Sequence, residues 1–334
     1  MKPPVLLTGG DPCGIGPEII ERALHELLTA DFPPLLYFAT GGAPHCERLL
    51  EMAAHRHISA GLLTESPVAP VQGLVVVDLA GSGTEKPGEP GLRGGVLAFR
   101  ALELAADYAG QKPARALVTA PLSKQWVERG AGCEFRGHTD YLAARAACPV
   151  LMLMHGHALS VVPLTVHIPL AEVPGRLREA VADPNLPGLL ERVAELPEMS
   201  SRSQDRPWAL CGLNPHSGEG GHMGREELNY LEGWADTLRA RGLRLDGPLS
   251  ADGLFSPGVR SRYRLILSCY HDQGLIPFKA LEAERGINVT IGLPYLRTSP
   301  DHGTAFEIAG RGIASATSMI QALSYAARAG LVEN

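Results

Sequence analysis

The chain has 334 residues, more than the roughly 250 to 300 at which a single core stops growing, so we expect two lobes. Its hydrophobic fraction of 45% and charged fraction of 20% are those of a globular protein, and its net charge of −6 argues against a nucleic-acid partner, which normally requires a basic surface. No stretch reaches the roughly 18 apolar residues of a membrane span and the N-terminal apolar run is too short for a secretory signal, so we expect a cytoplasmic protein.

Short apolar runs alternate with helical patterns in the first part of the chain. The runs at 5–8, 35–40, 75–78 and 116–120 predict strands, and the patterns at 17–30, 47–54 and 96–109 predict helices. The segment 81–95, GSGTEKPGEPGLRGG, is rich enough in Gly and Pro to predict a loop. This alternation predicts an α/β fold with a largely parallel sheet.

The second part of the chain continues the pattern. The apolar segment 151–166 is interrupted by His155, Gly156 and His157, which predicts two strands in a hairpin. Segments 209–213 and 265–268 predict buried strands, and 226–239 and 314–329 predict amphipathic helices. The six cysteines form no C-x-x-C pair, so we expect reduced and partly buried thiols.

A glycine-rich loop, TGGDPCGIGPE at 8–18, joins the first predicted strand to the first predicted helix. Such a loop can present backbone N–H groups to an anion at a helix N-terminus, with Pro17 well placed in the first turn. A tight turn without any ligand is an equally good interpretation. The glycine spacing does not match the dinucleotide-binding fingerprint, so a dinucleotide would have to bind in another way.

Three histidines stand at the ends of apparent strands, namely His167, His216 and His271. Strand ends at one edge of an α/β sheet converge on the ligand crevice, so these imidazoles could bind a divalent metal together. Their spacing carries no local metal motif, and a surface or hydrogen-bonded role for each is the alternative. Asp272 could orient the neighbouring His271, although adjacent side chains often point apart.

Lys279, Asn288 and Arg297 are a candidate set for binding an anion. Their charges and amide donors suit a phosphate or a carboxylate, whereas a solvated basic face is the alternative interpretation.

The segment RGHTD at 136–140 is a further candidate site. Gly137 allows backbone to approach a ligand, and His138 and Thr139 offer hydrogen-bond donors. The same residues could instead form a turn in which Thr139 or Asp140 caps a helix that begins at Tyr141.

Seven segments together resemble the 4-hydroxythreonine-4-phosphate dehydrogenase family of pyridoxal phosphate biosynthesis. They run in order along nearly the whole chain: GDPCGIGPEI (10–19), VTAPLSK (118–124), GHTDYLA (137–143), HIPL (167–170), LNPHSGEGG (213–221), YHDQGLIPFK (270–279) and INVTIGLPYLRTSPDHGTAFEIAG (287–310). The departures are small: Gly10 and Cys13 replace residues that are usually Met and Ala in the family.

The resemblance implies an isocitrate-dehydrogenase-like fold of two α/β lobes with an active-site cleft, in a homodimer whose sites lie near the interface. It implies a cofactor lobe of residues 1–130 and 285–334, and a lobe of residues 131–284 for metal, substrate and dimer contacts. The implied metal ligands are His167, His216 and His271. The implied substrate contacts are His138, Thr139, Lys279, Asn288 and Arg297. The implied dinucleotide contacts are Asp301, His302, Gly303 and Thr304.

The reaction implied by the resemblance is the NAD- or NADP-dependent oxidation of 4-phosphooxy-L-threonine to 2-amino-3-oxo-4-phosphooxybutanoate. That product loses CO2 to give 3-amino-2-oxopropyl phosphate, and a divalent ion (zinc, magnesium or cobalt) assists by lowering the pKa of the reacting hydroxyl. Lys279 and Asp252 are candidates for the base. The alternatives are a sister dehydrogenase for a phosphorylated sugar acid or a dihydrodiol dicarboxylate, a three-histidine metal hydrolase, and a non-enzymatic binding protein.

Overall fold

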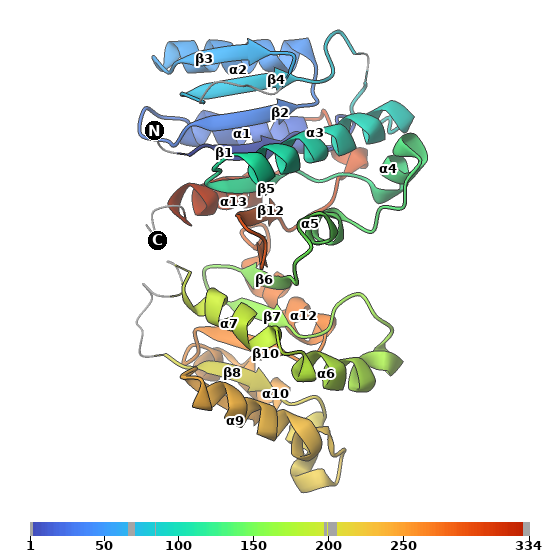
Figure 1. The fold of residues 1–334 in the computed structure, drawn as a ribbon, viewed down its shortest axis with the longest axis vertical. Helices are drawn as coiled ribbons and strands as arrows, with labels where there is room; N and C mark the ends of the chain where they lie inside the picture. Colours follow the sequence, from blue (N-terminus) through green and yellow to red (C-terminus); the bar gives the residue numbers. More distant parts are fainter. Residues whose placement is uncertain (1–2, 66–70, 84, 197–198, 200–205, 330–334) are drawn as a thin grey trace. The chain divides into compact units, whose positions relative to one another are not determined.

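The computed structural model describes residues 3–65, 71–83, 85–196, 199 and 206–329, and it divides into two compact units. Unit 1 consists of Met1–Cys148 and Leu293–Asn334, and unit 2 of Pro149–Gly292. The chain therefore changes units later than the expected positions 130 and 284. The predicted α/β class is confirmed, since both units are built from strands alternating with helices (Figure 1).

Unit 1 contains a wholly parallel set of strands in the order β3–β4–β2–β1–β5–β12. Their bounds are β1 (Val5–Thr8), β2 (Leu35–Ala39), β3 (Ala60–Leu63), β4 (Leu74–Asp78), β5 (Ala116–Thr119) and β12 (Leu296–Pro300). Every residue of β1, β2 and β5 is buried, as expected of parallel strands covered on both faces. The central strand β1 pairs Val5 with Leu35 on one side and with Ala116 on the other.

Helices cover both faces of this sheet. Figure 1 shows α3 in front of the strands, with α1 behind them; α13 packs on α1, β5 and β12. The helices of the unit are α1 (Gly16–Leu27), α2 (Ala43–His55), α3 (Leu92–Gln111), α4 (Lys124–Ala131), α5 (His138–Ala146) and α13 (Thr317–Ala329), with a short turn η4 (Phe306–Ile308).

Unit 2 has the strand order β11–β6–β7–β10–β8–β9, in which β6 runs antiparallel to both of its neighbours and the other pairs are parallel. The strands are β6 (Leu151–His155), β7 (Ser160–Pro163), β8 (Trp208–Cys211), β9 (Leu245–Leu249), β10 (Leu265–Ser268) and β11 (Ile287–Ile291). The helices and turns are η1 (Leu170–Glu172), α6 (Val173–Ala182), α7 (Leu186–Ala194), η2 (Pro215–Gly221), η3 (Glu227–Leu231), α9 (Glu232–Ala240), α10 (Ala251–Leu254), α11 (Pro257–Arg260) and α12 (His271–Glu282). Leu275 and Phe278 of α12 pack with Val161, Ala209 and Ile266 in the core of this unit.

Most predicted elements are confirmed, including the β6–β7 hairpin, but two differ. The predicted loop 81–95 ends earlier, because α3 already begins at Leu92; Thr84 within it lies outside the described residues, as do Met1 and Lys2. Gly94 and Gly95 are part of this helix, and a Cβ atom on Gly95 would lie only 2.0 Å from the Trp126 carbonyl oxygen of α4. The predicted helix 226–239 contains a π-helical turn, η3, before α9.

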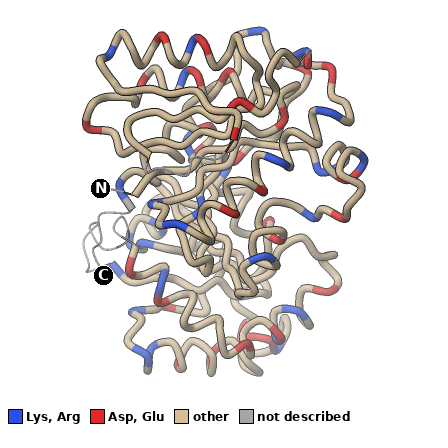
Figure 2. The backbone as a smooth tube through the Cα atoms, turned by 45° about the horizontal axis from the view of Figure 1, so that its top comes forward, with Lys and Arg blue, Asp and Glu red and all other residues tan. Residues whose placement is uncertain are grey.

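Acidic and basic residues are interspersed along the backbone of both units (Figure 2). None of the helices among the described residues is long and apolar enough to cross a membrane.

A buried carboxylate closes the β6–β7 turn. The Glu282 side chain, only 3% exposed, accepts hydrogen bonds from the backbone N–H groups of His157, Ala158 and Leu159 at 2.9, 2.5 and 2.7 Å. Gly156 leaves room for this carboxylate, since a Cβ there would lie 2.1 Å from the Glu282 carboxyl carbon. The acid at the end of α12 thus fixes the hairpin that carries the antiparallel part of the sheet.

We predict that Glu282→Gln lowers the free energy of unfolding by about 2–3 kcal/mol, because a neutral amide replaces a charged acceptor of three buried N–H groups. Urea denaturation of the purified protein measures this change. Glu284→Gln is the matched control, because Glu284 is exposed just beyond the same helix. Equal stability of the two variants would contradict the role given to Glu282.

Candidate functional site

The loops that follow β1 and β5 meet at the carboxyl edge of the unit 1 sheet. Strands β2, β4 and β3 extend from one side of β1, whereas β5 and β12 extend from the other. Gly10 has a φ of +69°, and a Cβ there would lie 2.2 Å from the Pro121 carbonyl oxygen, which accepts a hydrogen bond from the Asp11 N–H at 2.9 Å. In an α/β sheet, the point where strand order reverses is the usual ligand crevice.

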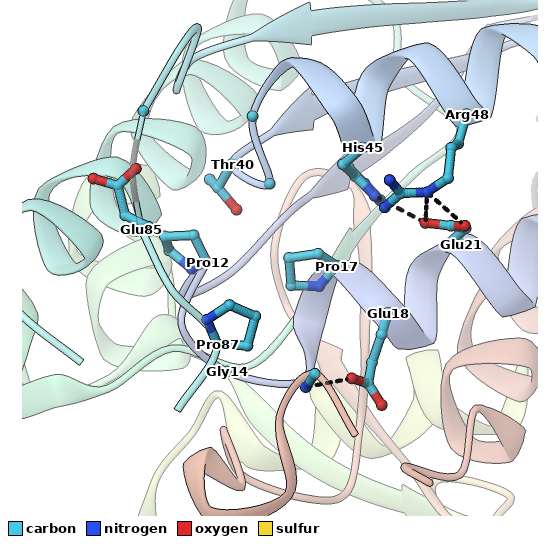
Figure 3. A pocket seen from close by; sticks show the side chains of 14 residues that line it. Pro12, Gly14, Pro17, Glu18, Glu21, Thr40, His45, Arg48, Glu85 and Pro87 are labelled. Carbon is cyan, nitrogen blue, oxygen red and sulfur yellow. Dashed lines mark hydrogen bonds and ion pairs between the residues drawn. The ribbon is translucent and has the colours of Figure 1, made fainter. Parts of the chain in front are cut away.

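A pocket of about 210 Å³ opens beside the glycine-rich loop in unit 1 (Figure 3). Its walls come from the glycine-rich loop and α1, from the start of α2, from the segment after β4, and from Gly310. The lining residues are Pro12, Gly14, Pro17, Glu18, Glu21, Thr40, Gly41, Gly42, His45, Arg48, Gly83, Glu85, Pro87 and Gly310. A pocket of this size and place suits part of an elongated ligand such as a dinucleotide.

Carboxylates on α1 hold the pocket walls in place. Glu18 accepts hydrogen bonds from the N–H groups of Gly310 at 2.7 Å and Ala314 at 3.3 Å. Glu21 accepts two bonds of 3.0 Å from Nε of Arg48. It also lies 3.4 Å from Nδ1 of His45 (Figure 3). Because a carboxylate only accepts, His45 donates through Nδ1.

The predicted cofactor loop packs directly against the glycine-rich loop. The Thr304 carbonyl accepts a hydrogen bond from the Ile15 N–H at 2.9 Å, and a Cβ on Gly14 would lie 2.8 Å from that same oxygen. Asp301 donates its N–H to the Ser318 hydroxyl, whereas His302 and Gly303 are exposed. The four residues therefore lie next to a loop that lines the pocket.

His138 stands at the first position of α5. The alternative interpretation, an N-cap at Thr139 or Asp140, is wrong, because Gly137, with a φ of 141°, is the N-cap and the helix begins at His138. Glycine suits this position because a side chain strongly disfavours that φ. No side chain caps the helix, so its first N–H groups have no side-chain acceptor at the N-cap.

The His138 imidazole is neutral and has one unused nitrogen. Burial lowers the pKa of His138 well below its usual range, and the positive charges of Arg297 and Lys124 lower it further. A hydrogen bond to the Ala120 backbone opposes this shift, and Nε2 is buried without a hydrogen-bond partner among the described residues. The bond to Ala120 therefore uses Nδ1 as donor, which leaves Nε2 as an acceptor.

Arg297 lies in β12 with only 3% of its surface exposed. Its guanidinium donates to the Thr119 hydroxyl at the end of β5, at 3.2 Å from Nε and 2.6 Å from Nη2. Burial lowers the pKa of Arg297 to about 10, which still leaves it charged at neutral pH. A buried guanidinium beside a neutral imidazole is a suitable receptor for an anionic group.

Two of the three predicted metal ligands approach each other in unit 2. The rings of His167 and His271 have centroids 5.6 Å apart. Nδ1 of His271 lies 2.7 Å from a carboxylate oxygen of Asp272, so these neighbours do point toward each other. This bond fixes the proton on Nδ1 and leaves Nε2 for a metal, which is the usual arrangement of a histidine ligand.

His216 lies in a turn with unusual backbone geometry. Residues 216–220 all have positive φ, between 43° and 78°, and His167 also has a φ of 53°. Side chains rarely adopt this conformation outside functional or strained segments. The Ser250 hydroxyl donates to the Asp252 carboxylate and lowers the pKa of Asp252, and His216 makes a smaller contribution in the same direction.

Two predicted substrate contacts lie on different elements of unit 2. Lys279 is exposed near the end of α12. Asn288 lies in β11, where its Oδ1 atom is buried without a hydrogen-bond partner among the described residues. An unused buried carbonyl of this kind is a common feature of a ligand site.

Sequence reasoning missed two residues beside His138, namely Thr119 and Lys124. Both belong to the VTAPLSK segment, and their signal was polar residues directly after a buried strand. In the part of the chain that the structure describes, no three His, Cys, Asp or Glu side chains gather closely enough to hold a metal ion. A complete three-histidine site is thus not formed within the described residues of one chain.

A family model and a relative of known name each match most of the chain. Residues 41–326 match the family model described as pyridoxal phosphate biosynthetic protein PdxA. A relative from Ruegeria sp. (strain TM1040), named 4-hydroxythreonine-4-phosphate dehydrogenase, is 39% identical over 336 residues, covering 96% of this chain and 95% of the relative.

Solved structures give the same result. That of 4-hydroxythreonine-4-phosphate dehydrogenase from Klebsiella pneumoniae has a TM-score of 0.75 at 31% identity, covering 99% of this chain and 98% of that one. A terephthalate 1,2-cis-dihydrodiol dehydrogenase from Burkholderia xenovorans LB400 has a TM-score of 0.62 at 27% identity, covering 97% of both chains. The fold implied by the sequence resemblance is confirmed.

The Glu21 carboxylate predicts a specific dependence of stability on pH. Hydrogen bonding to His45 and Arg48 lowers the pKa of Glu21 from 4.5 to about 2, against the opposing effect of burial. A carboxyl group with a lowered pKa stabilises the fold above its unfolded value, and this contribution is lost as pH falls through the folded value. The stabilisation should therefore be complete above about pH 5 and disappear between about pH 4.5 and pH 2.

We predict that Glu21→Gln lowers Tm at pH 7 and that this difference shrinks steadily below about pH 4.5. Thermal unfolding followed over a pH series measures it. Glu47→Gln on α2, next to Arg48 in the sequence, is the control because Glu47 is exposed, and it should show no such convergence. A difference in Tm for Glu21→Gln that is constant with pH would be inconsistent with the assignment.

Proposed function

Because the chain belongs to the PdxA family of pyridoxal phosphate biosynthetic proteins, we propose that it is a 4-hydroxythreonine-4-phosphate dehydrogenase. Within the structure, the observation that carries this proposal is the buried Arg297 guanidinium beside the unused Nε2 of His138. A charged donor and a neutral acceptor side by side suit a substrate that has anionic groups as well as a hydroxyl and an ammonium group.

In this proposal, unit 1 binds the substrate through three residues. Arg297 pairs with an anionic oxygen, and Thr139 offers its hydroxyl and N–H at the uncapped start of α5. His138 accepts a hydrogen bond from the substrate hydroxyl or ammonium through Nε2. Lys279 and Asn288 are the proposed contacts from unit 2, where the unused Oδ1 of Asn288 supports its role.

The proposed nicotinamide cofactor is NAD or NADP, and it binds in unit 1. The loop residues Asp301, His302, Gly303 and Thr304 are the proposed contacts. Their support is the bond between Thr304 and Ile15, which joins this loop to the glycine-rich loop lining the pocket. A dinucleotide can therefore be held here without the glycine spacing of the usual fingerprint.

The proposed metal ligands are His167, His271 and His216. The donor chemistry fits a divalent ion, because the His167 and His271 rings are close and Asp272 orients His271. Imidazole nitrogens suit zinc or cobalt better than magnesium, which prefers oxygen ligands. When bound, such an ion would supply a Lewis acid that polarises the reacting oxygen.

The proposed reaction has two steps. The C3 hydroxyl of 4-phosphooxy-L-threonine gives its proton to a base, while the C3 carbon transfers its hydrogen as hydride to the nicotinamide, which forms a β-keto acid. That acid loses CO2 and takes up a proton to give 3-amino-2-oxopropyl phosphate. Asp252, an exposed carboxylate near His216, and Lys279 remain the candidate bases. The cytoplasm is the proposed site of this metabolism.

A sister dehydrogenase activity is the second candidate. The similarity to a terephthalate dihydrodiol dehydrogenase favours it, because the two dehydrogenases named in these comparisons share a fold and each is named for a substrate that carries a hydroxyl group. A dihydrodiol dicarboxylate or a phosphorylated sugar acid could use the same cation and the same acceptor. Parallel assays with each substrate distinguish these activities.

We also propose that the chain forms a homodimer through unit 2. Large apolar side chains of this unit are exposed, and the four most exposed are Leu170, Ile276, Met223 and Leu228. Several of them follow the proposed metal ligands closely in the sequence. A second copy that covered these residues would bring its own histidines near them.

We predict that the purified protein with 4-phosphooxy-L-threonine and NAD or NADP produces the reduced nicotinamide, measured by its absorbance. Removal of divalent metal should abolish this activity while the protein stays folded, because the proposed ion has a catalytic role. His167→Ala and His271→Ala should lose bound metal and kcat together. Full turnover by verified metal-free enzyme would contradict the metal assignment, and turnover without a nicotinamide requirement would indicate a hydrolase.

We predict that two inactive variants partly restore activity in mixed dimers. If His216 of one copy joins His271 of another, random mixing of His216→Ala with His271→Ala chains gives one good site in half of the dimers. Activity should then approach about a quarter of the wild-type value by symmetry. Absence of recovery, with subunit exchange demonstrated by mass spectrometry, would show that both ligands come from the same chain.

A further inference from the structure

Lys124 occupies an electrostatically unfavourable position. It is the first residue of α4, directly after the N-cap Ser123. The N-terminus of a helix carries a partial positive charge, so a lysine there is repelled by the helix that contains it. The short connection from β5 to α4 therefore places a cation where an acidic residue would be expected.

A second helix N-terminus lies beside the same side chain. A Cβ atom on Gly137, the N-cap of α5, would lie 3.3 Å from Cε and 3.6 Å from Nζ of Lys124. The Lys124 ammonium is thus next to the uncapped start of α5 as well as at the start of α4. Among the described residues, no carboxylate forms an ion pair with it.

The neighbouring groups increase this excess of positive charge. Burial lowers the pKa of His138, and the charges of Arg297 and Lys124 lower it further, so its imidazole is neutral. Arg297 comes from β12 and Lys124 from α4, so two separate elements supply a cation that acts on His138. Two cations and two helix N-termini together match a group with two negative charges.

We propose that Lys124 is a substrate-binding residue that pairs with the phosphate group of the substrate at the N-terminus of α5. This proposal rests on the proposed function and adds a contact that the sequence resemblance did not supply. A lysine suits this position because its ammonium is a compact charge on a flexible stem, which can follow a phosphate as it enters. Arg297 then provides the directed bonds, and Lys124 the second charge.

A purely structural role for Lys124 makes the opposite prediction for stability. A lysine held against two helix N-termini destabilises the ligand-free fold, so its removal should leave Tm unchanged or raise it. A lysine that stabilises the fold by packing would lower Tm when replaced. The side chain is exposed, which leaves little packing to lose.

The test compares Lys124→Met with Lys112→Met in the full-length enzyme. Lys112 is the C-cap of α3 and precedes the start of β5, so its replacement removes the same charge at the opposite end of the strand from the loop that leads to Lys124. For 4-phosphooxy-L-threonine, Lys124→Met should raise KM by about 10- to 100-fold, the usual effect of losing a charged contact to a ligand. KM for the nicotinamide cofactor should stay within twofold, and Lys124→Arg should recover part of the loss.

The dephosphorylated substrate, 4-hydroxythreonine, identifies the group that Lys124 contacts. Lys124→Met should change its KM by less than twofold, because the phosphate is already absent. Equal losses for both substrates, or an unchanged KM for the phosphorylated one, would overturn the proposal.

A wild-type enzyme that oxidises no substrate would refute the proposed function and still leave Lys124 testable. Binding of inorganic phosphate to the wild type, Lys124→Met and Lys112→Met, measured by calorimetry, then tests the proposal. Weaker binding to Lys124→Met alone supports a phosphate contact. Equal binding to all three proteins overturns it.

Discussion

The close contact between the loops after β1 and β5 is the constraint on which the rest of unit 1 depends. Only glycine allows position 10 to approach the Pro121 carbonyl so closely, and the Asp11 N–H then bonds to that carbonyl. This contact fixes both loops at the place where the strand order reverses. The glycine-rich loop leads to the pocket and to Thr304, while the other loop leads to Lys124 and to the Ala120 carbonyl that orients His138. The proposed cofactor and substrate contacts of this unit thus share one rigid support.

Burial of charge has a cost, which an anionic ligand at Arg297 would help to offset. A charged guanidinium that is 97% removed from solvent loses its hydration, and the Thr119 hydroxyl is one of the groups that replace it. The left-handed conformations of His167 and His216 are a similar cost in unit 2. Evolution tolerates such features mainly where they serve a site. The buried charge of Arg297 and the left-handed backbone of His167 and His216 therefore indicate residues that the family resemblance also indicates.

Local patterns made much of the fold predictable, whereas the site depended on contacts between distant residues. Buried strands such as Val5–Thr8 and the hairpin around Gly156 followed directly from apolar periodicity. The start of α3 did not, because Gly94 and Gly95 are typical of loops and serve here to let helices approach closely. Likewise, nothing local shows that residue 138 and residue 297 act on each other, since 159 positions separate them and only the order of the strands brings them together. Lys124 was missed for this reason.

In each unit a hydrogen bond through Nδ1 of one histidine leaves Nε2 of that ring available, and the two rings suit different ligands. In unit 1, burial and nearby cations keep His138 neutral, and its bond to Ala120 selects the nitrogen that accepts. In unit 2, the carboxylate of Asp272 selects the nitrogen of His271 that remains available. An accepting nitrogen in the first case suits a hydroxyl or ammonium proton, and in the second case a metal ion. Because a backbone carbonyl adds no charge whereas a carboxylate does, only the second arrangement makes its imidazole a stronger electron donor, which is what a cation requires of its ligand.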